Sequence, residues 1–396
     1  MTEETLYQYD HKKRQLARPY EKSKLLLDSV AGTIIPIAAC LSLLFSGASL
    51  RMSRALTSAL GNYSLTVATY AMIFIIYLQL VEIPFRFYTG YIVDHDFGIS
   101  TQRVRGWVND ELKEFGIGVG LGVLGVTILY YLIRLTNLWW LVAATLFALL
   151  SILLSIILPY VIMPIFYKVT PLEDAALKED LLNMSKKVGA KSVHNVLVAD
   201  ESRRSVRANA MFSGIGSSRA IVLFDTLLNK FTRRELKTVV AHELGHYVNK
   251  DIWKSALISG VMSIPPFFLA DYALRWIGKD MGIFSASDPA GLPIIFAVLV
   301  AVGFVLQPIY NGFSRAIEHK ADEFALRVAD DADAQASAER RLADMSLSVD
   351  TPKRLVEWFF YSHPSASRRV RLAEDWKTRS SQVAIGNMNE RPNTDE

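Results

Sequence analysis

The sequence of 396 residues has a single cysteine, Cys40, and only seven histidines. One cysteine cannot form an intrachain disulfide or a cysteine-rich metal cluster, so a metal site must draw on few histidines. Charge is also scarce, because 43 lysines and arginines oppose 39 aspartates and glutamates and leave a formal net charge of only +4. This weak positive balance does not indicate a nucleic-acid-binding surface, and we expect no nucleic acid as a partner.

The apolar residues are gathered in long blocks. Five blocks contain no Asp, Glu, Lys or Arg: residues 29–50, 55–81, 115–133, 135–167 and 289–314. A sixth block, 252–277, is weaker because Pro265, Pro266 and Asp271 interrupt it. About 20 apolar residues suffice to cross the hydrocarbon core of a bilayer. We therefore predict a polytopic α-helical membrane protein with six spans rather than a large soluble protein with buried helices.

Basic residues beside these blocks predict how the chain is oriented. The segment 1–28 contains six lysines and arginines and the connection 86–114 contains four, whereas the connection 134–138 contains only Arg134. The positive-inside rule places 1–28, 86–114, 168–251 and the C-terminal region in the cytoplasm. The first 28 residues do not resemble a cleavable signal peptide. The tail has no retrieval signal, so we favour a prokaryotic plasma membrane over the endoplasmic reticulum.

Polar stretches divide the chain into a membrane part and a small domain. Four spans over 29–167 precede a polar insert over 168–251, and two spans over 252–313 precede a second polar region over 314–380. Residues 381–396 are expected to be disordered. In the insert we predict a helix from Thr170-Pro171 to Lys187, strands at 193–198, 208–212 and 220–224, and a helix opened by the capping box Thr232–Glu235. The chain is therefore expected to be mainly α, with a small α+β domain.

The capped helix contains the motif His242-Glu243-Leu244-Gly245-His246. Two histidines four residues apart lie on one face of a helix, so their imidazoles can share one Zn²⁺. Glu243 can then take a proton from a metal-activated water, as the general base of a metallopeptidase. A catalytic zinc also needs a third protein ligand and an open position. The motif thus predicts one Zn²⁺ per chain, in preference to a structural pair of surface histidines.

A third ligand is suggested by the segment Ser314-Arg315-Ala316-Ile317-Glu318-His319-Lys320-Ala321-Asp322. It resembles the S-R-x-x-E-x-x-A-D pattern of the M48 gluzincins, which are integral membrane zinc proteases. The resemblance implies that Glu318 is the third ligand and that Asp322 orients a ligating histidine. His319 is the competing candidate and would give a three-histidine site.

Within the M48 family, the sequence resembles the Ste24-type CAAX prenyl protease 1 branch. Asn209-Ala210-Met211-Phe212-Ser213-Gly214 is similar to the N-A-x-F-x-G strand of that branch, and His363-Pro364 followed by Arg369 is similar to its H-P-x-x-x-x-R element. The resemblance implies that Asn209, Ala210, Met211 and Phe212 hold an extended peptide along an edge strand. It also implies that His363 and Arg369 act on the substrate carbonyl. Ste24 proteins have seven spans, whereas six are predicted here.

These features predict a membrane zinc metalloendopeptidase with Glu243 as general base. Its expected partners are membrane lipid and a peptide or protein substrate, with a prenylated C-terminal peptide as the candidate suggested by the resemblance. One alternative is an HtpX-like protease that removes damaged membrane proteins. The other is an inactive lipid-binding or transport protein with a vestigial metal site, which the presence of Glu243 disfavours.

Overall fold

The computed structural model describes residues 6–157, 161–213 and 219–389, and most of them are helical. Five helical rods in this part of the chain are long and apolar enough to cross a membrane: 11–45, 63–96, 104–135, 251–280 and 289–329. A sixth apolar helix, Trp139–Leu154, is shorter within the described residues. The prediction of a polytopic α-helical membrane protein is confirmed, and the shorter helix lies where a sixth span was expected.

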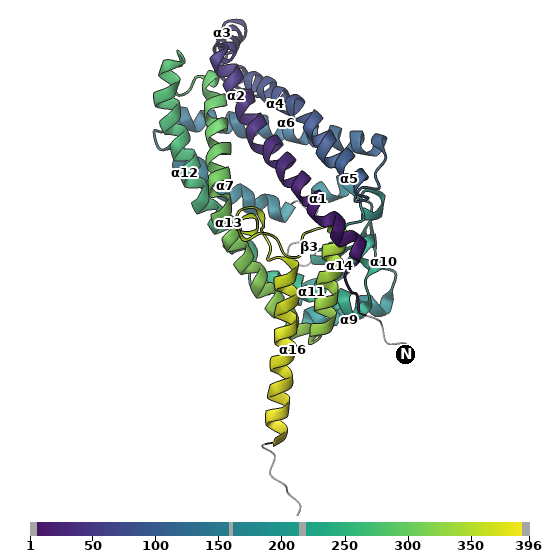
Figure 1. Ribbon diagram of the computed structural model, residues 1–396. Helices are drawn as coiled ribbons and strands as arrows, with labels where there is room; N and C mark the ends of the chain where they lie inside the picture. The colour runs from purple at the N-terminus through teal and green to yellow at the C-terminus, as the bar shows by residue number, and fades with distance from the viewer. Residues whose placement is uncertain (1–5, 158–160, 214–218, 390–396) are drawn as a thin grey trace, which may run out of the picture.

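The N-terminal half is a series of helices joined by short turns (Figure 1). Its elements are α1 (His11–Ser29), η1 (Val30–Ile34), α2 (Ile35–Phe45), α3 (Ala48–Leu60), α4 (Tyr63–Phe87), η2 (Tyr88–Val93), α5 (Asp94–Asp96), α6 (Val104–Leu135), α7 (Trp139–Ile157) and α8 (Met163–Phe166). The first two predicted spans have different bounds because Gly47 and Gly61 adopt positive φ angles of 67° and 58°. Such glycines separate helices, and α3 is therefore an independent element between two spans.

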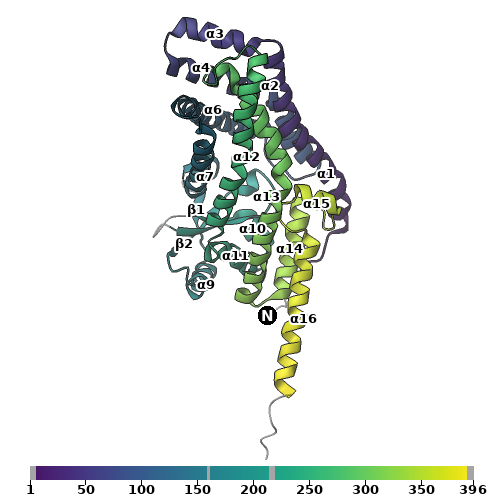
Figure 2. The same ribbon diagram turned by 90° about the vertical axis from the view of Figure 1, so that its left-hand side faces the viewer.

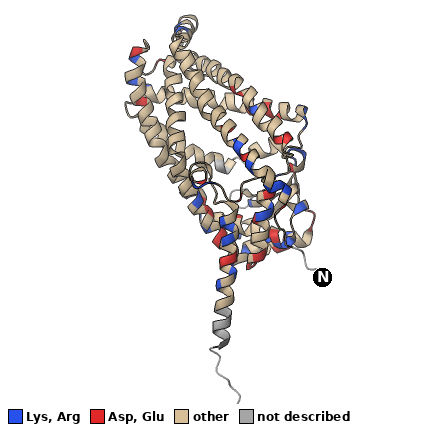
Figure 3. Ribbon diagram, in the orientation of Figure 1, with Lys and Arg blue, Asp and Glu red and all other residues tan. Residues whose placement is uncertain are grey.

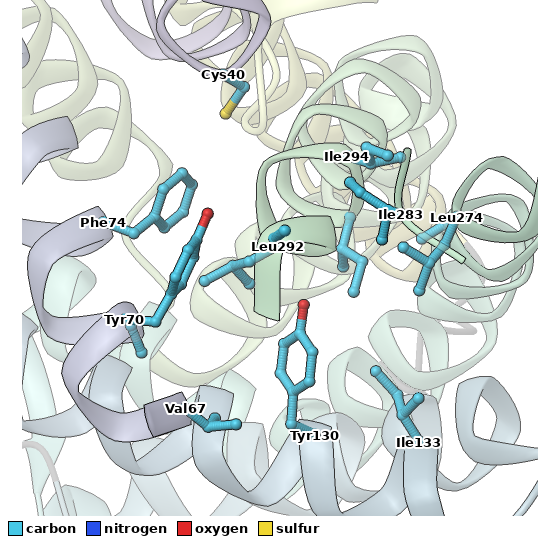
Figure 4. Packing of buried hydrophobic residues seen from close by; sticks show 14 of the residues in the cluster. Cys40, Val67, Tyr70, Phe74, Tyr130, Ile133, Leu274, Ile283, Leu292 and Ile294 are labelled. Carbon is cyan, nitrogen blue, oxygen red and sulfur yellow. The ribbon is translucent and has the colours of Figure 1, made fainter. Parts of the chain in front are cut away.

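The membrane helices pack around a shared apolar core. Buried side chains from α2, α4, α6 and α13 (Leu292–Ala329) meet there, and Figure 4 shows Cys40, Tyr70 and Tyr130 among them. The nearby Trp139 is also fully buried, and its indole N–H donates a 2.6 Å hydrogen bond to Asp271. The acidic residue that interrupted the sixth apolar block is thus paired inside the bundle, as a buried polar group requires.

The small domain contains a four-stranded sheet with the order β1-β2-β4-β3. Its strands are β1 (Val169–Pro171), β2 (Val193–Ala199), β3 (Ala210–Ser213) and β4 (Arg219–Phe224). β2 and β4 are parallel, and β3 pairs antiparallel with β4 at one edge of the described sheet. Three strands lie where they were predicted. Thr170-Pro171 was wrongly predicted to begin a helix: it pairs with β2, and α9 (Ala175–Lys187) begins at the N-cap Asp174.

The helix that carries the histidine motif, α11 (Arg233–Val248), is held at its start by a buried network. The predicted capping box is confirmed, with the Thr232 hydroxyl and the Glu235 carboxylate each accepting a backbone N–H of the other residue. Glu235 is fully buried and also accepts hydrogen bonds from Ser337 and Arg341 of α14 (Ala332–Ser346). A helix remote in sequence therefore helps to fix the orientation of α11.

The membrane helices continue directly into the small domain. α12 (Asp251–Asp280) begins three residues after α11 ends, and α13 runs without a break through position 314, where a boundary was expected. Its 38 residues are about 57 Å long, far more than the roughly 30 Å of a hydrocarbon core. In Figure 1, α13 descends beside α12 to the level of α11. Figure 3 shows charged residues concentrated in this lower region, while most of the upper bundle is uncharged.

The chain ends with α15 (Arg354–Phe360) and α16 (Ala366–Asn389). Figure 2 places α14 and α16 on one side of α13 and the strands β1 and β2 on the other. A disordered tail was expected over 381–396, but α16 extends as far as Asn389. Its C-terminal part projects from the rest of the molecule (Figure 1). Residues 390–396 lie outside the described part.

Candidate metal centre and peptide cleft

α11 and α13 bring three expected metal ligands together. The Nε2 atoms of His242 and His246 are 3.1 Å apart, and they lie 3.2 and 3.5 Å from the two carboxylate oxygens of Glu318. One ligand atom from each residue lies within 4.8 Å of the others. The competing candidate His319 lies elsewhere: its half-exposed ring is 3.6 Å from Glu323. The cluster therefore has two nitrogens and one carboxylate.

The hydrogen bonds behind this cluster hold both imidazoles in an orientation that suits a metal. His242 Nδ1 lies 2.8 Å from Asp322, and His246 Nδ1 lies 3.0 Å from Asp251. Because a carboxylate only accepts, each Nδ1 carries a proton, and a neutral ring then presents the lone pair of Nε2. Burial lowers the pKa of His242, but the neighbouring carboxylates of Asp322 and Glu318 raise it to about 10, so the cluster attracts positive charge. Glu318 Oε2 is buried without a hydrogen-bond donor among the described residues. Two imidazole nitrogens and a carboxylate that converge in this way fit Zn²⁺.

Asp251 was missed by the sequence analysis. It is buried at the start of α12, where it accepts from His246 and forms a 2.8 Å ion pair with Lys254. The available signal was its position, since it is the only acidic residue between His246 and Asp271. Its contact gives His246 the same carboxylate support that Asp322 gives His242.

The contacts of Arg369 indicate a role behind the metal ligands. Its guanidinium is largely buried and donates to Asp322 through Nε at 2.8 Å, while Nη1 lies 2.7 Å from Glu339. Burial raises the pKa of Glu339, and the positive charge of Arg369 opposes this shift. Because two buried carboxylates engage this guanidinium, Arg369 is placed to orient Asp322 and, through it, His242. Arg369 also lines the cavity beside the metal ligands, and its expected action on a substrate carbonyl stays a prediction.

His363 lies beside Glu318 of the cluster. Its exposed ring has Nε2 3.4 Å from Glu318 Oε1 and Nδ1 2.9 Å from the Ser362 hydroxyl. The turn that carries it, between α15 and α16, is held by Arg315, which donates to the carbonyls of Glu357 and Tyr361. Arg315 belongs to the segment that contains Glu318, but its role could not be predicted from the sequence. Its acceptors are backbone carbonyls more than 40 residues away along the chain.

A cavity of about 130 Å³ lies beside the metal ligands and is lined by Asn209, Ala210, His242, Glu243 and His363, among others. Met211 and Phe212 do not line it. Met211 packs under the sheet with Val222 and Phe224, since side chains alternate along a strand. The Phe212 ring stacks on Tyr247 at 6.1 Å. Two of the four residues expected to hold substrate therefore border the cavity. Burial raises the pKa of Glu243, and the neighbouring His242 opposes this shift.

Comparison with known proteins agrees with this arrangement. Residues 171–377 match peptidase family M48, and residues 2–168 match the CAAX prenyl protease N-terminal region with five membrane helices. An uncharacterized metalloprotease, YhfN of Bacillus subtilis, is 30% identical over 84% of this chain and 79% of its own length. CAAX prenyl protease 1 of Saccharomyces cerevisiae is 29% identical over 74% of this chain and 68% of its own.

A solved structure has the same fold. The crystal structure of S. mikatae Ste24p matches with a TM-score of 0.77, covering 91% of this chain and 88% of that chain at 24% identity. The membrane helices and the small domain are therefore arranged as in that protein.

The support of His246 by Asp251 can be tested by metal competition. We expect Asp251→Ala to weaken zinc binding by about 10- to 100-fold, because the Nδ1–H of His246 loses the acceptor that fixes its tautomer. Asp280→Ala, at the exposed other end of α12, is the matched control and should leave affinity unchanged. Equal zinc affinity of both variants in a chelator titration would show that Asp251 does not support the site.

Proposed function

The chain belongs to peptidase family M48, and from that premise we propose that it is a membrane zinc endopeptidase with one Zn²⁺ held by His242, His246 and Glu318. The observation that carries this proposal is the convergence of three metal-ligating side chains beside Glu243, at the end of an edge strand. A three-ligand site leaves one coordination position open, as catalytic zinc sites do.

Each residue around the cavity then has a distinct task. Zn²⁺ at this site would lower the pKa of a water molecule and polarise the scissile carbonyl. Glu243 accepts the proton of that water and transfers it to the leaving amine. Asp322 and Asp251 keep the two imidazoles in the ligating tautomer. His363, exposed and facing the same cavity, donates a hydrogen bond to the carbonyl oxygen as negative charge develops there.

The edge strand β3 supplies the binding surface for an extended peptide. β3 pairs with β4 on one side, and its other side faces no strand within the described sheet. An extended substrate can add to such an edge through backbone hydrogen bonds, which align the peptide without demanding a particular sequence. Asn209 and Ala210 border the cavity at the metal end of this strand and guide the peptide toward Glu243.

A prenylated C-terminal C-a-a-X peptide is the substrate we propose. Its support is that the M48 relatives of yeast and human are named CAAX prenyl protease 1 or its homolog. The HtpX-like alternative has no such support. A vestigial site in a lipid-binding or transport protein would not need the complete ligand set with Glu243 beside it.

The role of Glu243 gives the first test of this function. Glu243→Gln should retain zinc and the fold but lower peptide cleavage by about 10²- to 10⁴-fold, because an amide cannot accept the proton. Glu318→Ala should instead lose the zinc. Glu323→Gln, at a half-buried residue that faces His319, should change neither property. Near-normal cleavage by Glu243→Gln would contradict the mechanism; the measurements are zinc content by mass spectrometry and peptide turnover.

The substrate is tested by offering the same peptide with and without a farnesyl group. We expect kcat/KM to be about tenfold or more higher for the farnesylated C-a-a-X peptide, because burial of the apolar chain adds binding free energy. An unmodified, destabilised membrane protein is the third substrate in the assay. Preferential cleavage of that protein would support the HtpX-like alternative instead.

His363 and His319 form a natural pair for a test of carbonyl stabilisation. His363→Ala should lower turnover by about 10²-fold, the usual loss for one donor to a developing oxyanion, with zinc affinity unchanged. His319→Ala should have no effect, since its ring faces Glu323. Loss of zinc in His363→Ala would identify His363 as a ligand, and unchanged turnover would leave it without a catalytic role.

We further propose that the metal centre faces the cytoplasm of a prokaryotic cell. The support for the cytoplasmic side is that segments 1–28 and 86–114 are rich in basic residues, which the positive-inside rule assigns to the cytoplasm. Cys40 is the single cysteine and is buried. Replacing it by alanine gives a background in which only an introduced cysteine can be labelled. A cysteine at the exposed position Lys187 should react only with membrane-permeant reagents, and one at Arg54 in α3 should react from outside intact cells. The reverse pattern would invert the topology.

A further inference from the structure

A second cavity, of about 640 Å³, lies at the start of α6. It is lined by Arg103, Arg105, Arg203 and Arg204 together with four uncharged residues, and no acidic residue is among the described lining residues. It shares no lining residue with the cavity at the metal ligands. Four guanidinium groups around one hollow create a strongly positive site that the peptidase mechanism does not use.

Two of these arginines are neutralised, whereas the other two are not. Arg203 pairs with Asp200 at 2.9 Å, and Arg204 pairs with Asp110 at 2.7 Å. The side chains of Arg103 and Arg105 are exposed and form no hydrogen bond or ion pair within the described part of the chain. Arg204 also has a buried Nε atom without an acceptor there. The cavity therefore retains positive charge and free N–H donors for an anion.

The backbone adds to this preference for an anion. Arg103 is the N-cap of α6 and makes no side-chain capping hydrogen bond, and the first intrahelical bond is donated by Trp107. The N–H groups of residues 104–106 thus lack intrahelical acceptors at the positive end of a 32-residue helix. Guanidinium groups combined with a free helix N-terminus are suited to a phosphate group.

An exposed apolar stripe on α6 begins beside the residues that line this cavity and runs toward the uncharged part of the helix. Val104, Val108 and Leu112 are exposed and spaced four residues apart, so they lie along one face of α6. Leu112 is 66% exposed and lies three residues before the uncharged run 115–133. A free inorganic anion would gain nothing from this surface. A phosphate that carries acyl chains would place its headgroup in the cavity and its chains along the stripe.

We propose that the arginine-lined cavity at the start of α6 binds the phosphate headgroup of an anionic phospholipid, with the acyl chains lying along the exposed apolar face of α6. The two segments that line this cavity, 99–101 and 204–206, are hydrogen-bonded to each other. The Thr101 N–H donates to the Arg204 carbonyl at 3.0 Å, and the Val206 N–H donates to the Ile99 carbonyl at 3.0 Å. The second segment leads to Asn209 and β3, so a bound headgroup holds the segment that precedes the edge strand.

Lipid binding to the purified full-length protein in a neutral detergent tests the proposal. Phosphatidylglycerol and phosphatidylcholine are titrated separately, and bound lipid is counted by native mass spectrometry. Wild type should bind one phosphatidylglycerol in preference to phosphatidylcholine. Arg103→Gln/Arg105→Gln should weaken that binding about 25-fold, since each basic residue near an anionic lipid surface contributes roughly a factor of five.

Matched variants separate this site from general attraction of lipid to basic residues. Arg51→Gln/Arg54→Gln removes the same charge from α3 and should bind phosphatidylglycerol like wild type. Arg103→Lys/Arg105→Lys should retain most of the binding, which distinguishes loss of charge from misfolding. Equal binding by wild type and Arg103→Gln/Arg105→Gln would overturn the proposal. So would competition by millimolar inorganic phosphate as effective as that by the lipid, because the acyl chains would then contribute nothing.

Discussion

The close approach of α11 to α13 is the contact on which the metal centre depends. A Cβ atom at Gly245 would lie 3.2 Å from the Cα of Ala321 and 3.2 Å from the Phe324 side chain, so any larger residue would push the helices apart. Glu318 lies one turn from Ala321, and His242 and His246 flank Gly245. Even a small outward shift of the two helices would lengthen the distances from the carboxylate to both imidazoles. The glycine within the histidine motif is therefore a packing requirement of the site.

Buried carboxylates and one guanidinium keep this arrangement in a defined protonation state. Asp322 accepts from both His242 and Arg369, and Arg369 also pairs with Glu339. Leaving one such charge without its partner inside a protein costs several kcal/mol, so the group is stable only when complete. The network draws on α11, α13, α14 and α16. The orientation of His242 on α11 therefore depends on the correct packing of α14 and α16.

The membrane helices and the small domain form one framework. α12 begins three residues after α11 ends, and α13 contributes both a span and the residues Glu318 and Asp322. The two helices that carry the ligands are thus continuous with, or directly joined to, two helices of the bundle. Their spacing in the membrane fixes their spacing at the metal site, which explains how a domain with a small sheet can hold three ligands rigidly.

The sequence alone determined the class of the protein and its core chemistry, because those features depend on local patterns. Apolar block length predicted the membrane helices, and the four-residue spacing of His242 and His246 predicted a shared metal; a resemblance supplied Glu318. Contacts between remote residues could not be predicted in this way. The position of Arg369 behind His242 depends on how α16 packs against α14. Likewise, only the fold shows that Asp251 reaches His246, that Met211 packs with Val222 and Phe224, and that arginines from the start of α6 and from the segment after β2 line one cavity. A side chain's type and spacing are properties of the sequence, whereas its partner is decided by the packing of elements that lie far apart along the chain.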